Sequence, residues 1–354
     1  MKRLALIPIT LFGIMVINFL FVQLAPGGPV EQMMMKAERA AVPAATGRIS
    51  GGSGDVAAAD SAYRGGQGLQ ENLRRELEAQ FGFDRPAWKR FFIMMKNYAL
   101  FDFGKSFYQD KTVLRLIVEK LPVSVSLGVF STLLIYLISI PLGIQKAVRK
   151  GSAFDKNTSW MLIIAHAVPS FLLAIFLLIL FAGGRYASWF PLRGIVSDNW
   201  PDLSPARQIL DYLWHIALPV LSLTIGGLAG LTFLTKNAFL EELSKQYCRT
   251  ARAKGCTQRQ ILRRHVFRNA MLIVIAGFPG MLIGMLFTGS VLIEVIFSLD
   301  GLGLLGFESV QSRDYPVVFG TLYLFALLGL GLNLISDYIY TRVDPRIHFD
   351  ARRP

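Results

Sequence analysis

Cysteine, histidine and charged residues are scarce in this 354-residue sequence, and each scarcity excludes a class of protein. The two cysteines, Cys248 and Cys256, form no C-x-x-C pair, and no His-rich tract accompanies them, so the sequence predicts no metal site. The four histidines are scattered, and neither H-E-x-x-H nor G-x-S-x-G occurs, which argues against a hydrolase. We therefore expect no catalytic residue and no cofactor.

Charged residues make up only 17% of the chain, against roughly 25% in soluble proteins, whereas 53% of the residues are hydrophobic. The mean hydropathy is +0.45. Six segments are apolar over the roughly 20 residues that a helix needs to cross a membrane, so the sequence predicts an all-α membrane protein. The apolar run of the first segment exceeds the core of a secretory signal, and we expect it to be retained. The six predicted spans lie near 4–25, 123–147, 159–182, 213–235, 270–297 and 317–340.

The formal charge of +13 is concentrated in three segments. Basic residues gather in "QKAVRKGSAFDKNT", in the 236–269 loop and in the C-terminal tail. Because Lys and Arg in short loops favour the cytoplasm, these segments and both termini are predicted to be cytoplasmic. The long loop after the first span is then external, since loops beyond about 60 residues translocate largely regardless of charge.

The external loop is predicted to have two parts. The Gly-rich stretch 46–68 lacks apolar periodicity and is expected to be flexible. Two short amphipathic helices, separated at Gly82 and Pro86, follow it and can pack on the ends of the spans. The predicted regions of the chain are a first span at 1–25, an external loop at 26–120, a core at 121–342 that contains the 236–269 loop, and a tail at 343–354.

Two glycine motifs have the spacing of nucleotide-binding signatures but lack their context. "DGLGLLGF" places Gly301, Gly303 and Gly306 in G-x-G-x-x-G order, which binds a pyrophosphate only between a strand and a helix. "FGKSF" ends like a P-loop, but the first glycine of that motif would fall at Ala99. Both motifs are predicted on the outer side, so neither is expected to bind ATP, and the first is expected to form a compact re-entrant or turn structure.

The segment "CRTARAKGCTQRQILRRHVFRNA", residues 248–270, has seven basic residues and no acidic one. The sequence predicts a helix from Ala238 to Lys254 that Gly255 ends in the left-handed conformation. Thr257 and Gln260 have the spacing of a capping box, which predicts a second helix running into the fifth span. The result is a helical elbow on the cytoplasmic face.

Three kinds of partner come into question for this basic elbow: anionic lipid, a nucleic acid and a protein. Anionic lipid would attract any cytoplasmic loop of this charge, whereas a nucleic acid is disfavoured because no aromatic side chains are interleaved to stack bases. A protein partner is favoured by the small corner at Ala251 and Ala253, which allows close approach, and by arginines that pair with carboxylates.

The strings "RTARAKG" and "HVFRNA" resemble the cytoplasmic coupling loop, or EAA loop, of binding-protein-dependent ABC importer permeases. Arg249, Thr250 and Ala251 stand at the Glu-Ala-Ala positions, Gly255 is the motif glycine, and residues 265–268 replace Ile-x-Leu-Pro. Only one alanine and the glycine match the general consensus, but the whole string is typical of the dipeptide/oligopeptide branch. "FVQLAPGGP", "FDFGKSF", "FPLRGIVS", "RDYPVVFG" and "VDPRI" also match that branch. Within it the sequence is most similar to Yej-type B subunits, which are associated with uptake of peptides and microcin C.

The resemblance implies a type I ABC importer (MetI-like) fold in the bacterial inner membrane, with a first helix that wraps a partner and a five-helix core. It implies a second homologous permease subunit, two ATP-binding subunits or one fused ATPase, and a periplasmic peptide-binding protein. The elbow would sit in a groove on an ATPase and transmit force without catalysis. The residues expected to form this coupling loop are Arg249, Thr250, Ala251, Arg252, Ala253, Lys254, Gly255, Thr257, His265, Arg268 and Asn269.

Two ionisable residues within predicted spans are candidates for the translocation path or a gate, because such residues are costly in a membrane. Glu294 could instead hold the following "FSLDGLG" turn by hydrogen bonds. His166 could bind a carbonyl exposed by a kink at Pro169.

Two alternative functions compete with an ABC importer permease. A proton-coupled secondary transporter working alone should show mid-membrane carboxylates and inverted repeats, and neither is evident. A membrane-anchored receptor should have a stable domain in 26–120, which the Gly-rich part argues against.

Overall fold

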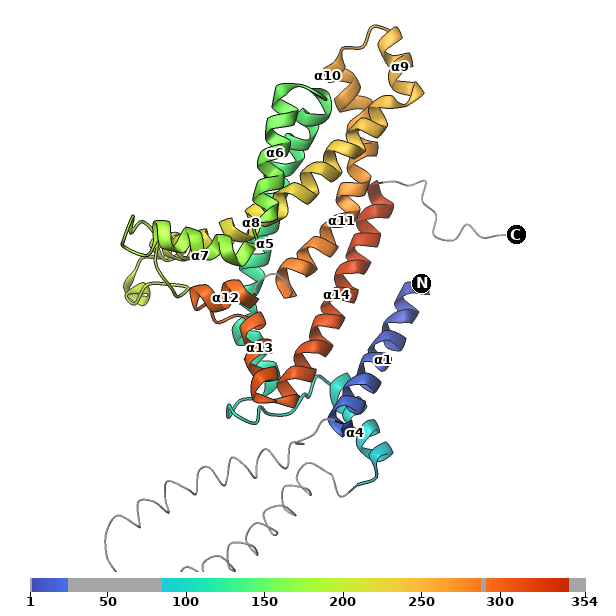
Figure 1. Cartoon of the computed structure of the whole chain (residues 1–354). Helices are drawn as coiled ribbons and strands as arrows, with labels where there is room; N and C mark the ends of the chain where they lie inside the picture. The colour runs from blue at the N-terminus through green and yellow to red at the C-terminus, as the bar shows by residue number, and fades with distance from the viewer. Residues whose placement is uncertain (1, 25–84, 288–290, 344–354) are drawn as a thin grey trace, which may run out of the picture. The chain divides into compact units, whose positions relative to one another are not determined.

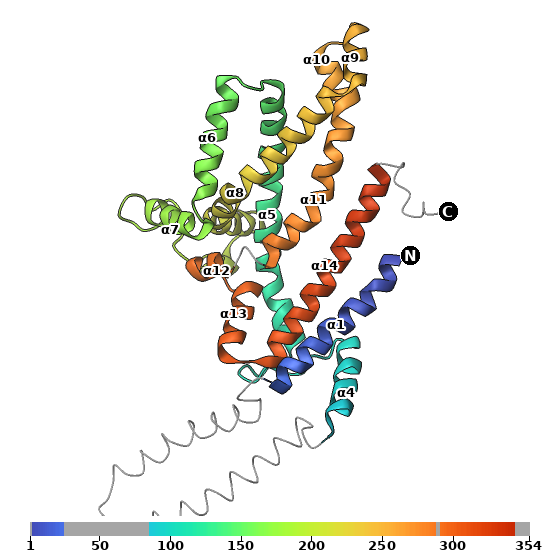
Figure 2. The ribbon, with the colours of Figure 1, turned by 45° about the vertical axis from the view of Figure 1, so that its right-hand side comes forward.

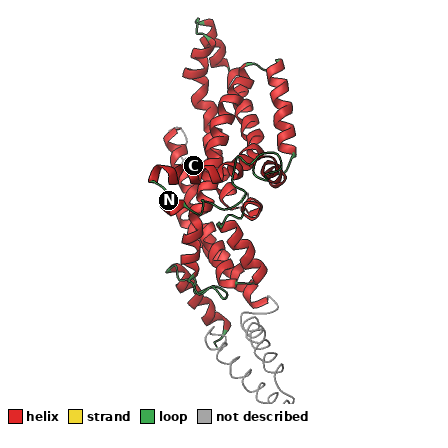
Figure 3. Cartoon of the chain, turned by 90° about the vertical axis from the view of Figure 1, so that its left-hand side faces the viewer, coloured by secondary structure: helices red, strands yellow, loops and turns green. Residues whose placement is uncertain are grey.

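The computed structural model describes residues 2–24, 85–287 and 291–343, and throughout these ranges the regular elements are helices (Figures 1 and 3). The predicted all-α class is confirmed. The Gly-rich stretch, Gly82 and the tail beyond residue 343 lie outside the described residues. The chain divides into two compact units, one made of 1–116 with 309–326 and the other of 117–308 with 327–354.

The first unit joins α1 (Lys2–Leu24) and α4 (Ala87–Ala99) through aromatic side chains. The ring of Phe91 in α4 meets Phe12 and Phe19 of α1 edge-on, at centroid distances of 5.9 and 5.3 Å. The helix α4 begins directly after Pro86, which fixes its own φ and has no N–H to lose. One of the two predicted amphipathic helices is thus confirmed as α4, and it packs on α1.

The second unit begins with α5 (Val113–Val148), whose first residues belong to the first unit, and continues with α6 (Ala153–Ala167) and α7 (Ser170–Phe181). The predicted span at 159–182 corresponds to α6 and α7, which are bent by 94° at the break between them, near the kink expected at Pro169. Pro169 explains the break: it pushes the preceding residue out of the helical region, and Val168 is extended with ψ 120°.

The helix α8 (Pro205–Ser244) follows the short η1 (Trp200–Asp202) and packs against α6, α7 and α11 (Figures 1 and 2). Its contact with α5 is close at Gly143, where a Cβ atom would lie 2.7 Å from Thr235 Cβ. A glycine is therefore needed at this crossing. Between α5, α7, α8 and α12 a core forms from side chains such as Leu127, Leu223 and Ile293.

After α8 the chain turns through α9 (Gln246–Ala253), α10 (Gln258–Ile261) and the π-helical η2 (Leu262–Val266) into α11 (Phe267–Phe287). The predicted unbroken helix from Ala238 to Lys254 was wrong. Lys245 is extended, with ψ 153°, and separates α8 from α9.

The described chain ends with α12 (Val291–Phe297), α13 (Leu302–Ser312) and α14 (Tyr315–Val343). The predicted span 270–297 corresponds to α11 and α12, with residues 288–290 outside the described part. Among the described residues, four helices are long and apolar enough to cross a membrane, or five if α6 and α7 form one span, and α1 has a shorter apolar stretch at 6–21.

Candidate functional site: a basic elbow between α8 and α11

The end of α9 has the hydrogen-bond pattern of a Schellman motif. Gly255 has φ +84°, and its N–H donates to the carbonyl of Arg252 at 3.0 Å. The N–H of Cys256 donates to the carbonyl of Ala251 at 3.1 Å. A Cβ atom on Gly255 would meet nothing within 4 Å, so the left-handed backbone alone requires glycine here. The predicted helix stop is confirmed.

The start of α10 is a capping box, as the sequence predicts. The Thr257 N–H donates to the side-chain oxygen of Gln260 at 2.8 Å, and the Gln260 N–H donates to the Thr257 hydroxyl at 3.4 Å. The helix then passes through η2, which contains His265, before it becomes α11. Such π segments are frequent at functional sites, and this one includes the first two residues, His265 and Val266, of the "HVFRNA" string.

The elbow has a hydrophobic core of its own, which Cys248 and Ala251 of α9 form with Phe239 of α8 and Val266 of η2. Ala251 is only 8% exposed. The expectation that Ala251 keeps an outer corner small was therefore wrong, because its side chain packs inward. Ala253 does remain exposed, so the outer corner has one alanine instead of two.

The remaining predicted coupling residues share the elbow's surface. Within the described part of the chain, Arg249, Arg252 and Lys254 make no ion pair. Their charge is therefore available to an acidic partner. The exposed members of the predicted set are Arg249, Thr250, Arg252, Ala253, Lys254, Gly255, Thr257, His265, Arg268 and Asn269.

A polar cluster at the α8–α9 corner was missed by the sequence reasoning. The buried carboxylate of Glu242 accepts hydrogen bonds from Lys245 Nζ and the Tyr247 hydroxyl. The bond to Glu242 raises the pKa of Lys245. Burial and the hydrogen bond to Glu242 raise the pKa of Tyr247. A hydrogen bond with the side chain of Asn269 lowers this pKa and so offsets part of the increase. Burial likewise raises the pKa of the Cys248 thiol. The spacing of Glu242, Lys245 and Tyr247 across a helix end gave no recognisable motif.

A second buried cluster ties α5, α6 and α8 together next to the elbow. Lys146 Nζ is fully buried, lies 3.2 Å from Asp155 Oδ1 and donates to Thr158 and Ser159 at 2.7 Å each. Lys236 Nζ donates to both Asp155 oxygens, at 2.7 and 2.9 Å. Two of the three predicted cytoplasmic segments, the α5–α6 turn and the elbow, therefore lie at the same end of this unit.

Glu294 is completely buried and holds the turn that follows it. Its carboxylate accepts hydrogen bonds from the Ser124 hydroxyl at 2.9 Å and from the Leu304 N–H at 2.7 Å. This geometry agrees with the expected turn-holding role. The glycines of "DGLGLLGF" accordingly belong to a turn and to α13, with Gly301 pressed against the Glu294 carboxylate.

His166 lies at the α6–α7 break and remains exposed. Its Nδ1 is 3.0 Å from the carbonyl oxygen of Gly226 in α8. The expected bond to a carbonyl therefore exists, but the carbonyl belongs to a neighbouring helix and not to the kinked one.

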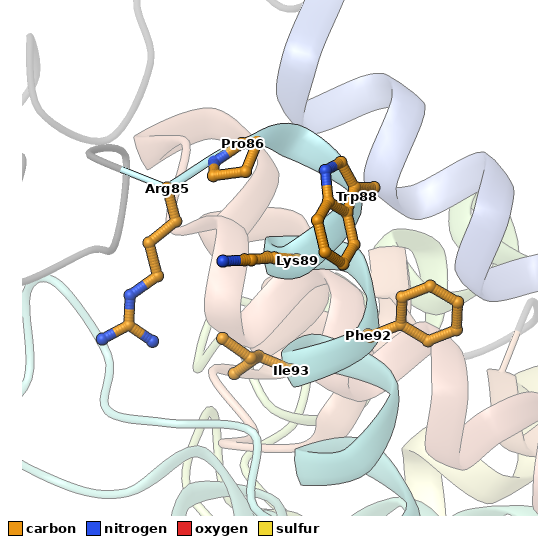
Figure 4. A pocket seen from close by; sticks show the side chains of 6 residues that line it. All are labelled: Arg85, Pro86, Trp88, Lys89, Phe92 and Ile93. Carbon is orange, nitrogen blue, oxygen red and sulfur yellow. The ribbon is translucent and has the colours of Figure 1, made fainter.

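The remaining motifs have structural roles. In "FGKSF", the Ser106 hydroxyl and the Phe107 N–H both donate to the carboxylate of Asp314, the second at 3.2 Å. No group of three His, Cys, Asp or Glu side chains among the described residues could hold a metal. A hollow of about 640 Å³ lies along α4 in the first unit (Figure 4). We assign it no function, because a single short segment lines it: Arg85, Pro86, Trp88, Lys89, Phe92 and Ile93.

Residues 139–349 match the family described as binding-protein-dependent transport system inner membrane component. The chain belongs to this family, and it is a non-catalytic, multi-pass permease of the inner membrane in an ABC transport system. Such a system implies a solute-binding protein and an ATPase as partners. The alternatives of a secondary transporter working alone and of a membrane-anchored receptor were therefore wrong.

Close relatives match the chain from end to end. A peptidoglycan transport system permease protein YejB of Agrobacterium fabrum is 55% identical over 358 residues, covering 99% of this chain and 98% of the relative. An inner membrane ABC transporter permease protein YejB of Escherichia coli O157:H7 is 54% identical over 360 residues, with 99% and 98% covered. An inward-facing MetNI methionine ABC transporter structure aligns with a TM-score of 0.48 at 17% identity, covering 65% of this chain and 97% of that one.

Proposed function

We propose that this permease forms half of the translocation path for peptides or peptide-like compounds, and that its elbow receives force from an ATPase. The observation that supports the proposal most is the elbow itself. A buried core and two helix caps hold its backbone, while Arg249, Arg252 and Lys254 on its surface make no ion pair among the described residues. A rigid, positively charged projection suits a complementary acidic groove.

The proposed assembly is a heterodimer with a second homologous permease subunit, in a type I importer (MetI-like) fold of six spans with both termini cytoplasmic. Two ATP-binding subunits, or one fused ATPase, would dock beneath it, and a periplasmic peptide-binding protein would deliver the substrate. Side chains on α1 support the proposed wrapping of a partner, because Ile9 and Phe21 are 65% and 63% exposed. Membrane lipid would cover the rest of this apolar surface, and nucleic acid has no place in the assembly.

The proposed substrate class is peptides. The sequence strings of the dipeptide/oligopeptide branch support this class, and the name of the Agrobacterium relative, a peptidoglycan transport permease, points to peptide-bearing material as well. Microcin C, itself a peptide with a nucleotide attached, fits the same class and stays a prediction.

We place His166, rather than Glu294, in the translocation path. Irregular backbone at membrane depth is tolerated where it is buried in protein or lines a water-filled cavity, and the exposed His166 stands at such a break. With Nδ1 engaged by Gly226, the other ring nitrogen is left for a peptide group. Glu294 has no exposed surface and would act on a gate only through the turn it holds.

The test is recovery of the ATP-binding subunits with the tagged permease in detergent. The double charge reversal Arg249→Glu with Arg252→Glu should lower recovery at least tenfold, a change of about 1.4 kcal/mol in binding. Arg207→Glu, at an exposed position at the opposite end of α8, serves as the control and should leave recovery unchanged. Equal recovery with both variants would refute the proposed docking.

A further inference from the structure

Glu242 occupies the joint between α8, the longest helix in the described part of the chain, and the elbow. The helix α8 has 40 residues, or about 60 Å at 1.5 Å per residue. One extended residue, Lys245, separates it from α9. The regular hydrogen bonding of the helix is interrupted at such a residue, so the stiffness of the joint depends on the main-chain and side-chain contacts that cross it.

The helix α9 has few features that would stabilise it on its own. It has only eight residues, and its N-cap, Lys245, makes no side-chain capping bond. Isolated helices shorter than about 12 residues are marginal in water. Its orientation must therefore come from contacts with the rest of the elbow and with α8.

Glu242 supplies those contacts from both its main chain and its side chain. The Glu242 carbonyl accepts from the Lys245 N–H at 3.2 Å and from Cys248 Sγ at 3.3 Å. The carboxylate accepts from Lys245 Nζ and from the Tyr247 hydroxyl. One residue at the end of α8 thus binds three residues across the break.

The neighbouring Glu241 shows that this arrangement is specific to one of two adjacent carboxylates. The side chain of Glu241 is 75% exposed, and its nearest approach to Lys245 Nζ is 3.9 Å. The side chain of Glu242 is 11% exposed. Hydrogen bonds to a buried charged group are stronger than contacts of an exposed pair.

We infer that Glu242 is a positioning residue for energy coupling, which locks α9 to α8 so that movement of the elbow carries the transmembrane helix with it. The inference rests on the proposed function, because it gives that elbow its rigid attachment. The side chain of Glu242 is only 11% exposed, so it belongs to the interior of the joint and not to the docking surface. Its loss should leave the exposed docking surface intact but let the joint bend, so that ATP is hydrolysed with less transport.

The experiment compares Glu242→Gln with Glu241→Gln in the complete transporter in lipid vesicles, supplied with peptide-loaded binding protein. Three quantities are measured: recovery of the ATP-binding subunits, ATP hydrolysed, and peptide transported. Glu242→Gln should keep the subunits but lower the peptide transported per ATP by roughly tenfold, as expected for a lost charge-assisted hydrogen bond. Glu241→Gln should match the wild type. A merely structural defect would lower the yield of complexes and not this ratio.

An unchanged ratio in Glu242→Gln overturns the inference, while recovery of the ATP-binding subunits with the wild type still supports the proposed function. Failure of those subunits to bind the wild-type permease would refute the proposed function itself. If Glu242→Gln does not assemble, Tyr247→Phe removes a single donor to the same carboxylate. A lowered ratio in that variant supports the inference, and a wild-type ratio overturns it.

Discussion

Gly301 lies so close to Glu294 that a Cβ atom on the glycine would be 2.5 Å from the carboxylate carbon. The buried carboxylate also accepts a hydrogen bond from Leu304 N–H across the same turn. Glycine and carboxylate together shape the passage from α12 to α13. The acid is therefore a component of this turn, and its hydrogen bonds explain how an ionisable group is tolerated where exposure is zero.

Replacing Gly301 by alanine should displace Glu294 and destabilise the protein by about 1–3 kcal/mol, the usual cost of overpacking. The thermal midpoint of the purified permease in detergent measures this change. Gly306→Ala is the matched control, because a Cβ atom there would meet nothing within 4 Å. Equal midpoints for the two variants would contradict the described contact.

Removing the carboxylate of Asp155 should be among the most destabilising substitutions in the second unit. Asp155→Ala leaves the buried ammonium group of Lys146 without its counter-ion, and breaking a buried ion pair on one side costs about 3–5 kcal/mol. Chemical or thermal unfolding in detergent reports the loss. Asp198→Asn, at an exposed position, should have little effect on stability. If Asp155→Ala lost no more stability than Asp198→Asn, the buried cluster would contribute nothing to the folded state.

The backbone of Gly255 should matter more for coupling than the space around it. Gly255→Ala should strain the elbow by about 1 kcal/mol, whereas Gly255→Asn should be tolerated better, because Asn adopts the left-handed conformation more readily. Gly255→Pro should abolish ATP-dependent uptake in vesicles. Gly151→Ala is the control, since Gly151 has a similar φ of +78° in the α5–α6 turn. Normal uptake by Gly255→Pro would refute the coupling role of this corner.

Substitution of His166 separates its bond to α8 from a role in the path. Asparagine can keep a hydrogen bond to the Gly226 carbonyl but lacks the second ring nitrogen. We expect His166→Asn to lower peptide uptake by roughly tenfold, as for one lost hydrogen bond, with normal stability and normal recovery of the ATPase. Uptake at the wild-type rate would remove His166 from the path.

Local sequence signals predicted the caps of the elbow because they depend on a few adjacent residues. The Gly255 stop and the Thr257 capping box follow from backbone conformation and hydrogen-bond spacing. The break at Lys245 was missed because nothing in its neighbourhood disfavours helix. The inward side chain of Ala251 and the Glu242 cluster depend on tertiary packing, which periodicity in so short a helix does not reveal.

In the membrane-spanning part, too, the sequence predicted local features and missed those that depend on tertiary packing. Hydropathy located most of the spans. It presented α6 and α7 as one segment, because the sequence is apolar both before and after Val168. Pro169 was recognised as a cause of bending, but a bend of 94° depends on the packing of α7 against α8 and α12. The Lys146–Asp155–Lys236 cluster joins three helices, and no single segment contains its pattern.

The most direct test of the central claim is site-specific photo-cross-linking from Ala253, an exposed residue of the elbow. Position 207, exposed near the other end of α8, is the matched site for comparison. In the assembled transporter, the account predicts a cross-link to an ATP-binding subunit from position 253 and none from position 207. Cross-links from position 253 to lipid alone, in a transporter that still imports peptide, would contradict it.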